Sequence, residues 1–500
     1  MTTLSTPYTH RFVWPSSKTG QGTGTFFFCV LMIAVLAKAS AREIPPAVPP
    51  PKPITLPEPV VRQLSNGLKV MVIERHSLPI LDLHLVVKAG AEADPQDLPG
   101  TAQMVAALLS QGTERRSAQQ IAETIDSVGG TIETEAGWDN SFASLTVTSD
   151  RAEFAFDLLA DIVLRPAFKA AEIERKRKQT LSALEISNGD PAYLADTTFT
   201  RMVNLGTPYG HPPDGTLDAV RRLTPADLRN FYAHNYRPSN TILAVIGDIS
   251  PEESVRLAEK VFGEWAAGAT GERELTSRPA ARAKQVIVVD KPDAVQTEIR
   301  IGNLAIQRDS PDYDALTIAN QILGGPAANR LFRALRSREG LMYGASSDLV
   351  AHRTLGSWEA KTSTRTSETI KTAQVMLDQM KQLRDHPISE QELETAKSYM
   401  IGHQALEFES AESVATQFLE LMVYNLPIDT WGRFPERIRR FTNQEVWERT
   451  RQYLDPDRAL ILLVGNAAAF KKDLKKLGPA RLIPLRSLDF ASESLEKPKD

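Results

Sequence analysis

The sequence of 500 residues contains a single cysteine and eight histidines, and it has no dense run of charges of one sign. The cysteine, Cys29, lies in an apolar run near the N-terminus, so disulfides have no part in holding the body of the protein together. Net charge is −4, with lysine and arginine dispersed along the chain. Nucleic acid is therefore a poor candidate partner. No two histidines fall at the spacing of a metal-binding pair.

The composition is that of an ordinary globular protein. Hydrophobic residues make up 42% of the chain and charged residues 24%. A chain of this length can bury a large core, and its length favours two or more domains. Beyond the N-terminal region, no stretch is long and apolar enough to cross a membrane.

The first 41 residues have the pattern of a secretory signal peptide. An apolar run from Phe26 to Ala37 is too short to span a bilayer comfortably, and it leads to Ala39-Ser40-Ala41, an A-x-A cleavage pattern. We therefore expect cleavage after Ala41 and export, with the periplasm as the destination. The alternative is an uncleaved N-terminal membrane anchor. Eight prolines follow within residues 44–59, so residues 42–59 are interpreted as an extended tether.

Strand and helix patterns alternate in blocks through the rest of the chain. Asn66-Gly67 separates two apolar segments and predicts a hairpin. Residues 99–110 are apolar on most faces and predict a buried helix, and Ser117 opens a capping box for the next helix. Residues 131–148 alternate as strands do. No glycine-rich nucleotide loop is present, so the sequence predicts an α+β fold.

An internal repeat gives the domain organisation. The segment 223–249 recurs 218 residues later, without a gap, as 441–467. Each copy contains a helix cap, a proline, an apolar strand and a glycine. The matched pairs are Thr224 and Thr442, Asp227 and Glu445, Pro238 and Pro456, and Gly247 and Gly465.

The repeat predicts two homologous α/β-sandwich-like halves. We expect the first domain at 60–265 and the second at 285–480. Residues 266–284 have linker composition, and residues 481–500 have the composition of a loose polar tail.

Several short motifs carry a resemblance to a known family. They are Tyr209–Pro212, Leu223–Leu228, Phe231-Tyr232, Tyr236–Pro238 and Val245–Asp248 in the first half, and Leu323–Pro326, Arg330–Phe332, Leu335-Arg336 and Gly340–Tyr343 in the second. Together they resemble the pitrilysin/insulinase-type zinc metallopeptidase family, in its processing-peptidase-like branch. The resemblance covers almost all of residues 60–480. It implies that the two halves of this chain form one half of a clamshell.

The zinc motif of that family is degenerate here. Active members carry H-x-x-E-H on the first long helix, where two histidines hold the metal and the glutamate is the general base. The corresponding positions are Gln103, Ala106 and Ala107. The third ligand of the family corresponds to Glu185, but Lys178 stands where an acidic neighbour is usual. The chain therefore resembles the family's non-catalytic subunits, and we expect no metal in it.

The second half keeps residues to which the resemblance assigns a role. In paired enzymes of the family an arginine and a tyrosine reach the zinc site of the other half or subunit, and Arg336 and Tyr343 match them. Alternatively, the arginine lies on a helix surface and the tyrosine packs in the core. Gly324 and Gly325 either let substrate backbone pass closely or simply begin a helix. Residues 131–137 match a strand that binds peptides by adding a strand to the sheet.

The sequence thus favours a pseudo-peptidase subunit that works with a zinc-bearing paralogous subunit on peptide substrates. The first alternative is a zinc-free binding or scaffold protein of the cell envelope. The second is an independent hydrolase with an unfamiliar site. A neighbouring reading frame that encodes a similar protein with an intact zinc motif would favour the subunit hypothesis.

Overall fold

The computed structural model describes residues 56–268, 283–326 and 329–497. These residues belong to one compact unit, Pro53–Asp500. The expected signal peptide, most of the proline-rich tether and most of the linker lie outside the described residues. Within the described part of the chain, no helix is long and apolar enough to cross a membrane.

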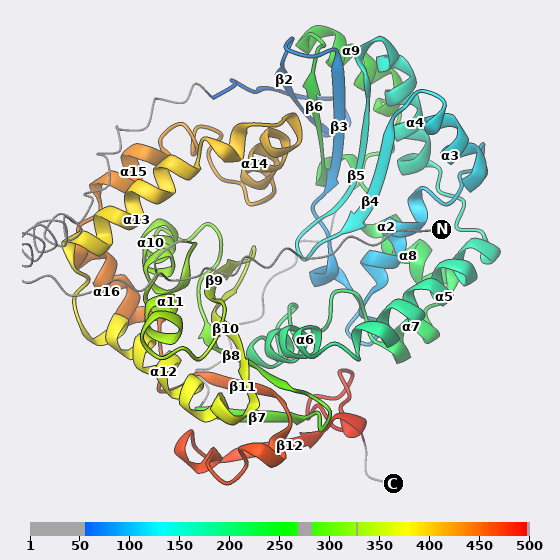
Figure 1. Cartoon of the computed structure of the whole chain (residues 1–500). Helices are drawn as coiled ribbons and strands as arrows, with labels where there is room; N and C mark the ends of the chain where they lie inside the picture. Colours follow the sequence, from blue (N-terminus) through cyan, green and yellow to red (C-terminus); the bar gives the residue numbers. More distant parts are fainter. Residues whose placement is uncertain (1–55, 269–282, 327–328, 498–500) are drawn as a thin grey trace, which may run out of the picture. The chain divides into compact units, whose positions relative to one another are not determined.

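The first sheet has six strands in the order β1–β2–β6–β3–β5–β4 (Figure 1). Its strands are β1 Val60–Gln63, β2 Lys69–Glu74, β3 Ile80–Val87, β4 Thr131–Ala136, β5 Ser141–Thr148 and β6 Thr241–Gly247. The expected hairpin at Asn66-Gly67 is confirmed, because β1 and β2 pair antiparallel around that turn. Strand β6 is buried along its whole length, as expected for a central strand covered on both faces.

The second sheet has the order β12–β7–β11–β8–β10–β9, in which five strands repeat the first sheet; the edge strand differs, because β12 ends its half and is parallel to β7, whereas β1 begins its half and is antiparallel to β2. Its strands are β7 Gln285–Asp290, β8 Gln296–Leu304, β9 Ala345–Ala351, β10 Gly356–Arg365, β11 Leu460–Gly465 and β12 Ala480–Pro484. In each half the central strand is parallel to one neighbour and antiparallel to the other. The predicted α+β fold with two similar halves is therefore confirmed.

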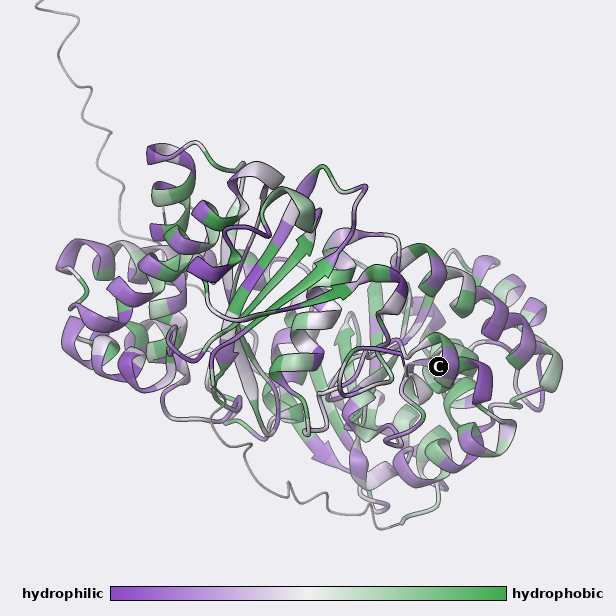
Figure 2. Ribbon diagram, turned by 90° about the horizontal axis from the view of Figure 1, so that it is seen from below, coloured by the Kyte–Doolittle hydropathy of each residue, from purple (hydrophilic) through white to green (hydrophobic). Residues whose placement is uncertain are grey.

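Helices cover both sheets (Figure 1). Those of the first half are α2 Thr101–Leu109, α3 Ala118–Asp126, α4 Ala152–Leu164, α5 Ala170–Ser187, α6 Pro191–Val203, α7 Leu217–Arg222, α8 Pro225–Asn235 and α9 Pro251–Phe262. Those of the second are α10 Tyr313–Gly324, α11 Arg330–Phe332, α12 Thr369–Asp385, α13 Glu390–His403, α14 Ala411–Val423, α15 Phe434–Arg440 and α16 Asn443–Tyr453. Figure 2 shows hydrophobic residues concentrated in the central strands, whereas the helices carry both hydrophobic and hydrophilic residues.

The sequence repeat has a structural basis. Thr224 and Thr442 both form complete capping boxes at the start of equivalent helices, α8 and α16. The glycines that end β6 and β11 lie where a side chain would clash with the adjacent strand, at Ile80 and at Thr297 respectively. Both the caps and the glycines are thus needed for the same local geometry in each half.

Each half contributes one helix that packs on the sheet of the other half. Helix α14 packs on β6 and β3 of the first sheet, and its residues Phe418 and Leu419 lie in one apolar cluster with Ile242 and Ile246 of β6. Helix α6 packs on the second sheet, and its residue Phe199 lies in the cluster formed there. Burial of each large apolar side chain contributes about 1.5–3 kcal/mol. The exchange therefore holds the two halves together through apolar contacts.

The C-terminal residues differ from the expected loose polar tail. Residues 480–484 form β12, which pairs with β7. Further on, Leu495 is completely buried in the cluster that contains α6. Arg201 of α6 donates to the backbone oxygen of Ser492. A few apolar residues spaced among polar ones are enough to dock this segment, and its mean composition conceals them.

Candidate functional site

Helix α2 carries the positions of the degenerate zinc motif. Its N-terminus is capped from a distance by Asp94, whose two carboxylate oxygens accept from the backbone N–H groups of Gly100 (2.6 Å) and Ala102 (2.7 Å). A carboxylate is favourable there because it meets the positive end of the helix dipole. Gly100 has φ +91°, and a side chain on it would press against the backbone of Gly215.

The three motif positions do not fit a zinc ion. Ala106 is fully buried and Ala107 nearly so, and neither side chain has an atom that can bind a metal. The carboxamide oxygen of Gln103 accepts a hydrogen bond from the backbone N–H of Ala136 on β4 (2.9 Å). Among the described residues, no group of three or more His, Cys, Asp or Glu is placed to hold a metal.

Glu185, the remaining family ligand, lies on the exposed surface of α5. Its side chain is 60% exposed, and its nearest ion-pair partner is Arg221 at 3.8 Å. This is the environment of an ordinary solvated helix residue. His403 and Glu407 form an exposed pair at 3.0 Å, which supplies only two ligands.

The hydrogen bond to Gln103 also defines the free side of an edge strand. Strand β4 is the last strand of the first sheet, paired only with β5. Donors alternate in direction along a strand, so the N–H groups of Ile132 and Thr134 point the same way as that of Ala136, away from β5. The predicted strand at 131–137 is therefore present, and its geometry suits the addition of a peptide strand.

Arg336 and Tyr343 lie close together at the end of a π-helical turn, η4 (Arg333–Arg338), which continues α11. The guanidinium of Arg336 donates to the backbone oxygen of Tyr343 (3.1 Å) and lies 5.9 Å from its ring centre. The Tyr343 side chain is 88% exposed. The alternative in which this tyrosine packs in the core does not hold. A π-helical turn is often found at functional sites.

Contacts within the chain account for both glycines at the C-terminal end of α10. A side chain on Gly324 would clash with the backbone of Ser347 on β9, and one on Gly325 would clash with Gln321. Both residues are buried. Close packing against β9 thus accounts for Gly324, and the close approach to Gln321 of α10 accounts for Gly325.

A buried polar cluster lies between the halves, and no pattern in the sequence indicates it. Asp139, in the turn between β4 and β5, accepts hydrogen bonds from the hydroxyls of Tyr209 (2.7 Å) and Tyr424 (2.9 Å). It also accepts from the backbone N–H of Arg353 (3.1 Å). Burial by itself would raise the pKa of Asp139, but contacts with His352 and the two tyrosines lower it below its usual range.

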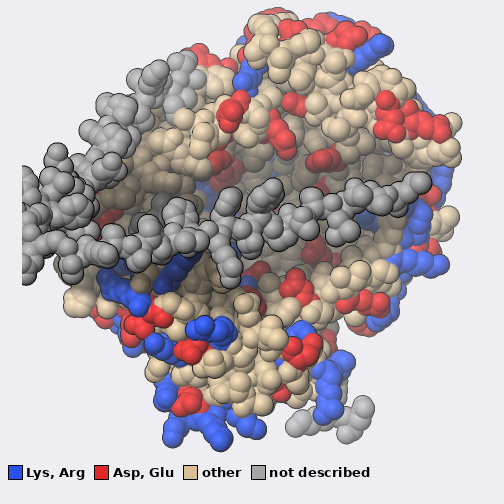
Figure 3. Space-filling view, in the orientation of Figure 1, with Lys and Arg blue, Asp and Glu red and all other residues tan. Residues whose placement is uncertain are grey.

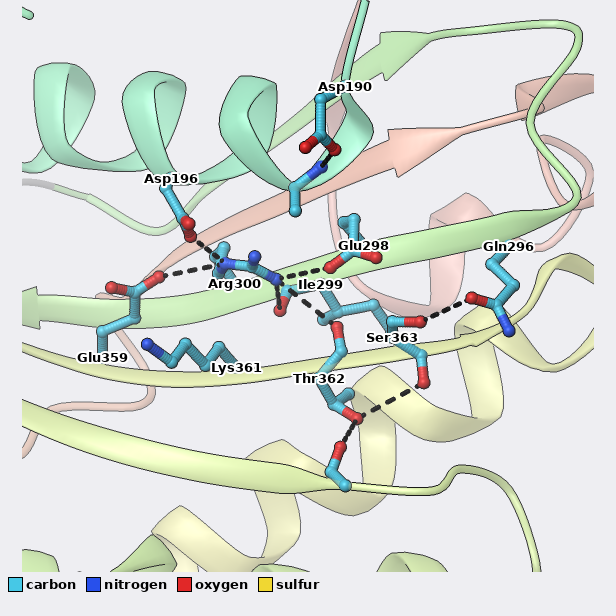
Figure 4. Close-up of polar contacts among 12 residues, drawn as sticks. Asp190, Asp196, Gln296, Glu298, Ile299, Arg300, Glu359, Lys361, Thr362 and Ser363 are labelled. Carbon is cyan, nitrogen blue, oxygen red and sulfur yellow. Dashed lines mark hydrogen bonds and ion pairs between the residues drawn. The ribbon is translucent and has the colours of Figure 1, made fainter. Parts of the chain in front are cut away.

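A second cluster, buried on the sheet side and open at Asp196, joins α6 to the second sheet (Figure 4). Arg300 of β8 donates to Asp196 of α6 (2.7 Å) and to Glu298 (3.0 Å), and it lies 3.5 Å from Glu359. Burial raises the pKa of Glu359 to about 8; Arg300 opposes this shift and Asp196 adds to it. The sequence signal for this cluster is a pair of charged residues, Glu298 and Arg300, within one strand whose central residues are mostly buried.

The fold and the site define a two-domain peptidase-like fold in which the positions of α2 matched to the zinc motif hold Gln103, Ala106 and Ala107. Comparison with known proteins agrees. Residues 69–208 match the family profile described as insulinase (peptidase family M16), and residues 222–400 match the peptidase M16 inactive domain. The chain belongs to the M16 insulinase family.

Relatives in this family carry different descriptions. An uncharacterized zinc protease of Mycobacterium leprae is 25% identical over 351 residues, which is 70% of this chain and 79% of that protein. The non-peptidase homolog YmxG of Helicobacter pylori is 22% identical over 421 residues, which is 83% of this chain and 95% of that protein.

Solved structures show the same fold. A peptidase M16 inactive domain from Pseudomonas fluorescens has a TM-score of 0.76 and 28% identity, covering 82% of this chain and 98% of that one. The periplasmic protease PqqL of Escherichia coli has a TM-score of 0.70 and 17% identity, covering 87% of this chain and 51% of that chain.

Proposed function

We propose that this chain is the non-catalytic subunit of an exported heterodimeric zinc peptidase. It would close over a related, zinc-bearing subunit like one half of a clamshell, and would supply Arg336 and Tyr343 to that subunit's site. One observation carries the proposal. The chain has no metal-binding side chains on α2, yet it presents an 88% exposed tyrosine beside an arginine.

The chemistry of the pair suits peptide hydrolysis in a shared site. When bound, the partner's zinc would supply the activated water. The Tyr343 hydroxyl would donate a hydrogen bond to the oxygen of the scissile carbonyl as negative charge develops on it. The Arg336 guanidinium already holds the backbone of Tyr343, and its remaining donors would orient the peptide carbonyl.

The substrate class is inferred to be peptides or unfolded segments. A peptide strand could add to β4, where the outward N–H groups of Ile132 and Thr134 would pair with it. Passage of the peptide near Gly324 and Gly325 rests on the family resemblance alone, because both glycines are already required by packing.

Pairing and export have support from one relative. This chain corresponds to about half of PqqL, a protein described as a periplasmic protease. That likeness fits a chain that needs a second, similar half. N-terminal sequencing of the protein extracted from the envelope would test export: a start at Arg42 supports it, whereas a start at Met1 in the membrane fraction would indicate an anchor.

A zinc-free envelope binding or scaffold protein is the second candidate. It is favoured by the relative described as a non-peptidase homolog, which this chain matches over 95% of its length. To separate the two, peptide hydrolysis is measured with this chain alone, with a related subunit carrying an intact zinc motif alone, and with the mixture. Activity that appears only in the mixture supports the subunit. Binding of the two proteins with no gain in activity supports the scaffold.

A further inference from the structure

We propose that the second half contains a binding site for a small oxyanion ligand with two or more negative charges, such as a diphosphate or a phosphate ester. The site is a cavity of about 400 Å³ between α11, η4, α12 and the start of α13. Its lining includes Arg330, Arg333, Arg338, Gln379, Gln382 and Glu392. Figure 3 shows blue side chains gathered in the region of α11.

The charges around the cavity are unbalanced. Both oxygens of Glu392 are engaged by the guanidinium of Arg330, at 2.8 and 2.9 Å. Arg333 approaches the same carboxylate at 3.3 Å. Burial opposes ionisation of Glu392, but Arg330 and the Ser389 cap lower its pKa to about 2. The single negative charge of Glu392 is thus shared by two arginines. Arg338 has no ion pair with any described residue.

A buried amide also faces the cavity. Gln379 is only 8% exposed and lines the cavity. Its carboxamide has two N–H donors that it can offer to a ligand there. A ligand with oxygen acceptors would satisfy the amide donors at the same time as the arginines.

The size and the donor geometry favour a small ligand. The volume is within the usual range for small-molecule sites. Guanidinium groups match the oxygens of phosphate and carboxylate through paired hydrogen bonds. Arg330 is held by two hydrogen bonds to Glu392, whereas Arg333 has one longer contact with it and Arg338 has none. Arg333 and Arg338 therefore keep most of their donors for a ligand.

The test is calorimetric titration of the mature chain with inorganic pyrophosphate at fixed ionic strength. We expect one site per chain. Arg333→Gln and Arg338→Gln should each weaken binding about tenfold, as loss of a charge-assisted hydrogen bond does. Gln379→Met, which keeps the side-chain volume, should also weaken it. Arg365→Gln, at an exposed arginine without an ion pair among the described residues, is the matched control and should bind normally.

Titration with citrate shows whether the ligand is a phosphate or a carboxylate compound. Tighter binding of citrate than of pyrophosphate would identify a polycarboxylate ligand and would still support the site. Absence of binding at millimolar pyrophosphate would overturn the proposal, as would equal weakening by Arg365→Gln. Binding of a polyglutamate peptide without binding of pyrophosphate would overturn it too, and would point to an acidic protein partner. The experiment uses this chain alone, so its result does not depend on the proposed peptidase pairing.

Discussion

The buried carboxylate of Asp139 accepts a hydrogen bond from the hydroxyl of Tyr424, at 2.9 Å, and this bond joins the two halves of the chain. Tyr424 directly follows α14, the helix that the second half places on the first sheet. Tyr209, a few residues after α6, donates to the other oxygen of the same carboxylate. Each of the two tyrosines thus follows one of the helices that pack on the opposite half, α6 or α14, and both donate to the carboxylate of Asp139.

The first prediction concerns the stability of this junction. Asp139→Ala leaves two buried hydroxyls and the Arg353 N–H without their acceptor, and should lower the free energy of unfolding by about 3 kcal/mol or more. Tyr424→Phe removes one hydrogen bond and should cost about 1–2 kcal/mol. Chemical denaturation would measure both. Asp126→Ala, at an exposed helix residue, should change little, and an equally small effect for Asp139→Ala would show that the junction is not stabilising.

The second prediction concerns pH. Because the pKa of Glu359 is raised to about 8 in the folded chain from 4.5, the folded state holds a proton that the unfolded state releases. Stability from this group should therefore fall as pH rises from about 5 to 8, with a slope of at most about 1.4 kcal/mol per pH unit. Glu359→Gln mimics the protonated acid, and should flatten the profile and stabilise the chain at pH 8.

The control for that profile is Glu264→Gln, which changes an exposed glutamate. Thermal melting of the three proteins between pH 5 and 9 would give the comparison. If wild type and Glu359→Gln showed parallel profiles, the carboxyl of Glu359 would be ionised throughout this range, and its pairing with Arg300 would outweigh the effect of burial.

The third prediction concerns metal and the side chain of Gln103. The purified mature chain should hold no stoichiometric zinc after dialysis, because Ala106 and Ala107 provide no ligand and Gln103 is engaged by β4. Gln103→Ala should leave metal content unchanged and lower stability by about 1 kcal/mol, since the Ala136 N–H loses its acceptor. Metal analysis that found about one tightly held zinc per chain would contradict this account.

Much of the fold followed from local signals. The capping boxes at Ser117, Thr224 and Thr442 and the turn at Asn66-Gly67 are short-range features, and each was predictable from a few residues. The edge position of β4 was expected only from the family resemblance, because strand order depends on pairing between distant segments.

What could not be predicted depends on contacts between distant residues. Nothing in the sequence near Asp139 distinguishes it from other turn aspartates, and its importance comes from Tyr209, Tyr424 and Arg353. The docking of Leu495 beside α6 is likewise hidden in a polar segment. The exposure of Tyr343 could not be read from the sequence either, since its neighbours Leu341 and Met342 are buried.

The fourth prediction tests the central claim, that this chain completes a partner's site through Tyr343. Tyr343→Phe removes only a hydroxyl from an exposed ring, so folding and partner binding should be unchanged. Loss of one oxyanion donor typically costs roughly 2.7–4 kcal/mol in the transition state, or about 10²–10³ in rate. Arg336→Gln should also lower activity, with a larger share of the effect on KM.

The most direct measurement is kcat for peptide hydrolysis by the zinc-bearing partner mixed with wild-type chain or with Tyr343→Phe, at saturating chain and with partner affinity measured separately. We expect kcat to fall about 10²-fold or more with Tyr343→Phe, while partner affinity stays unchanged. Full activity of the Tyr343→Phe mixture, at unchanged partner affinity, would contradict the central claim.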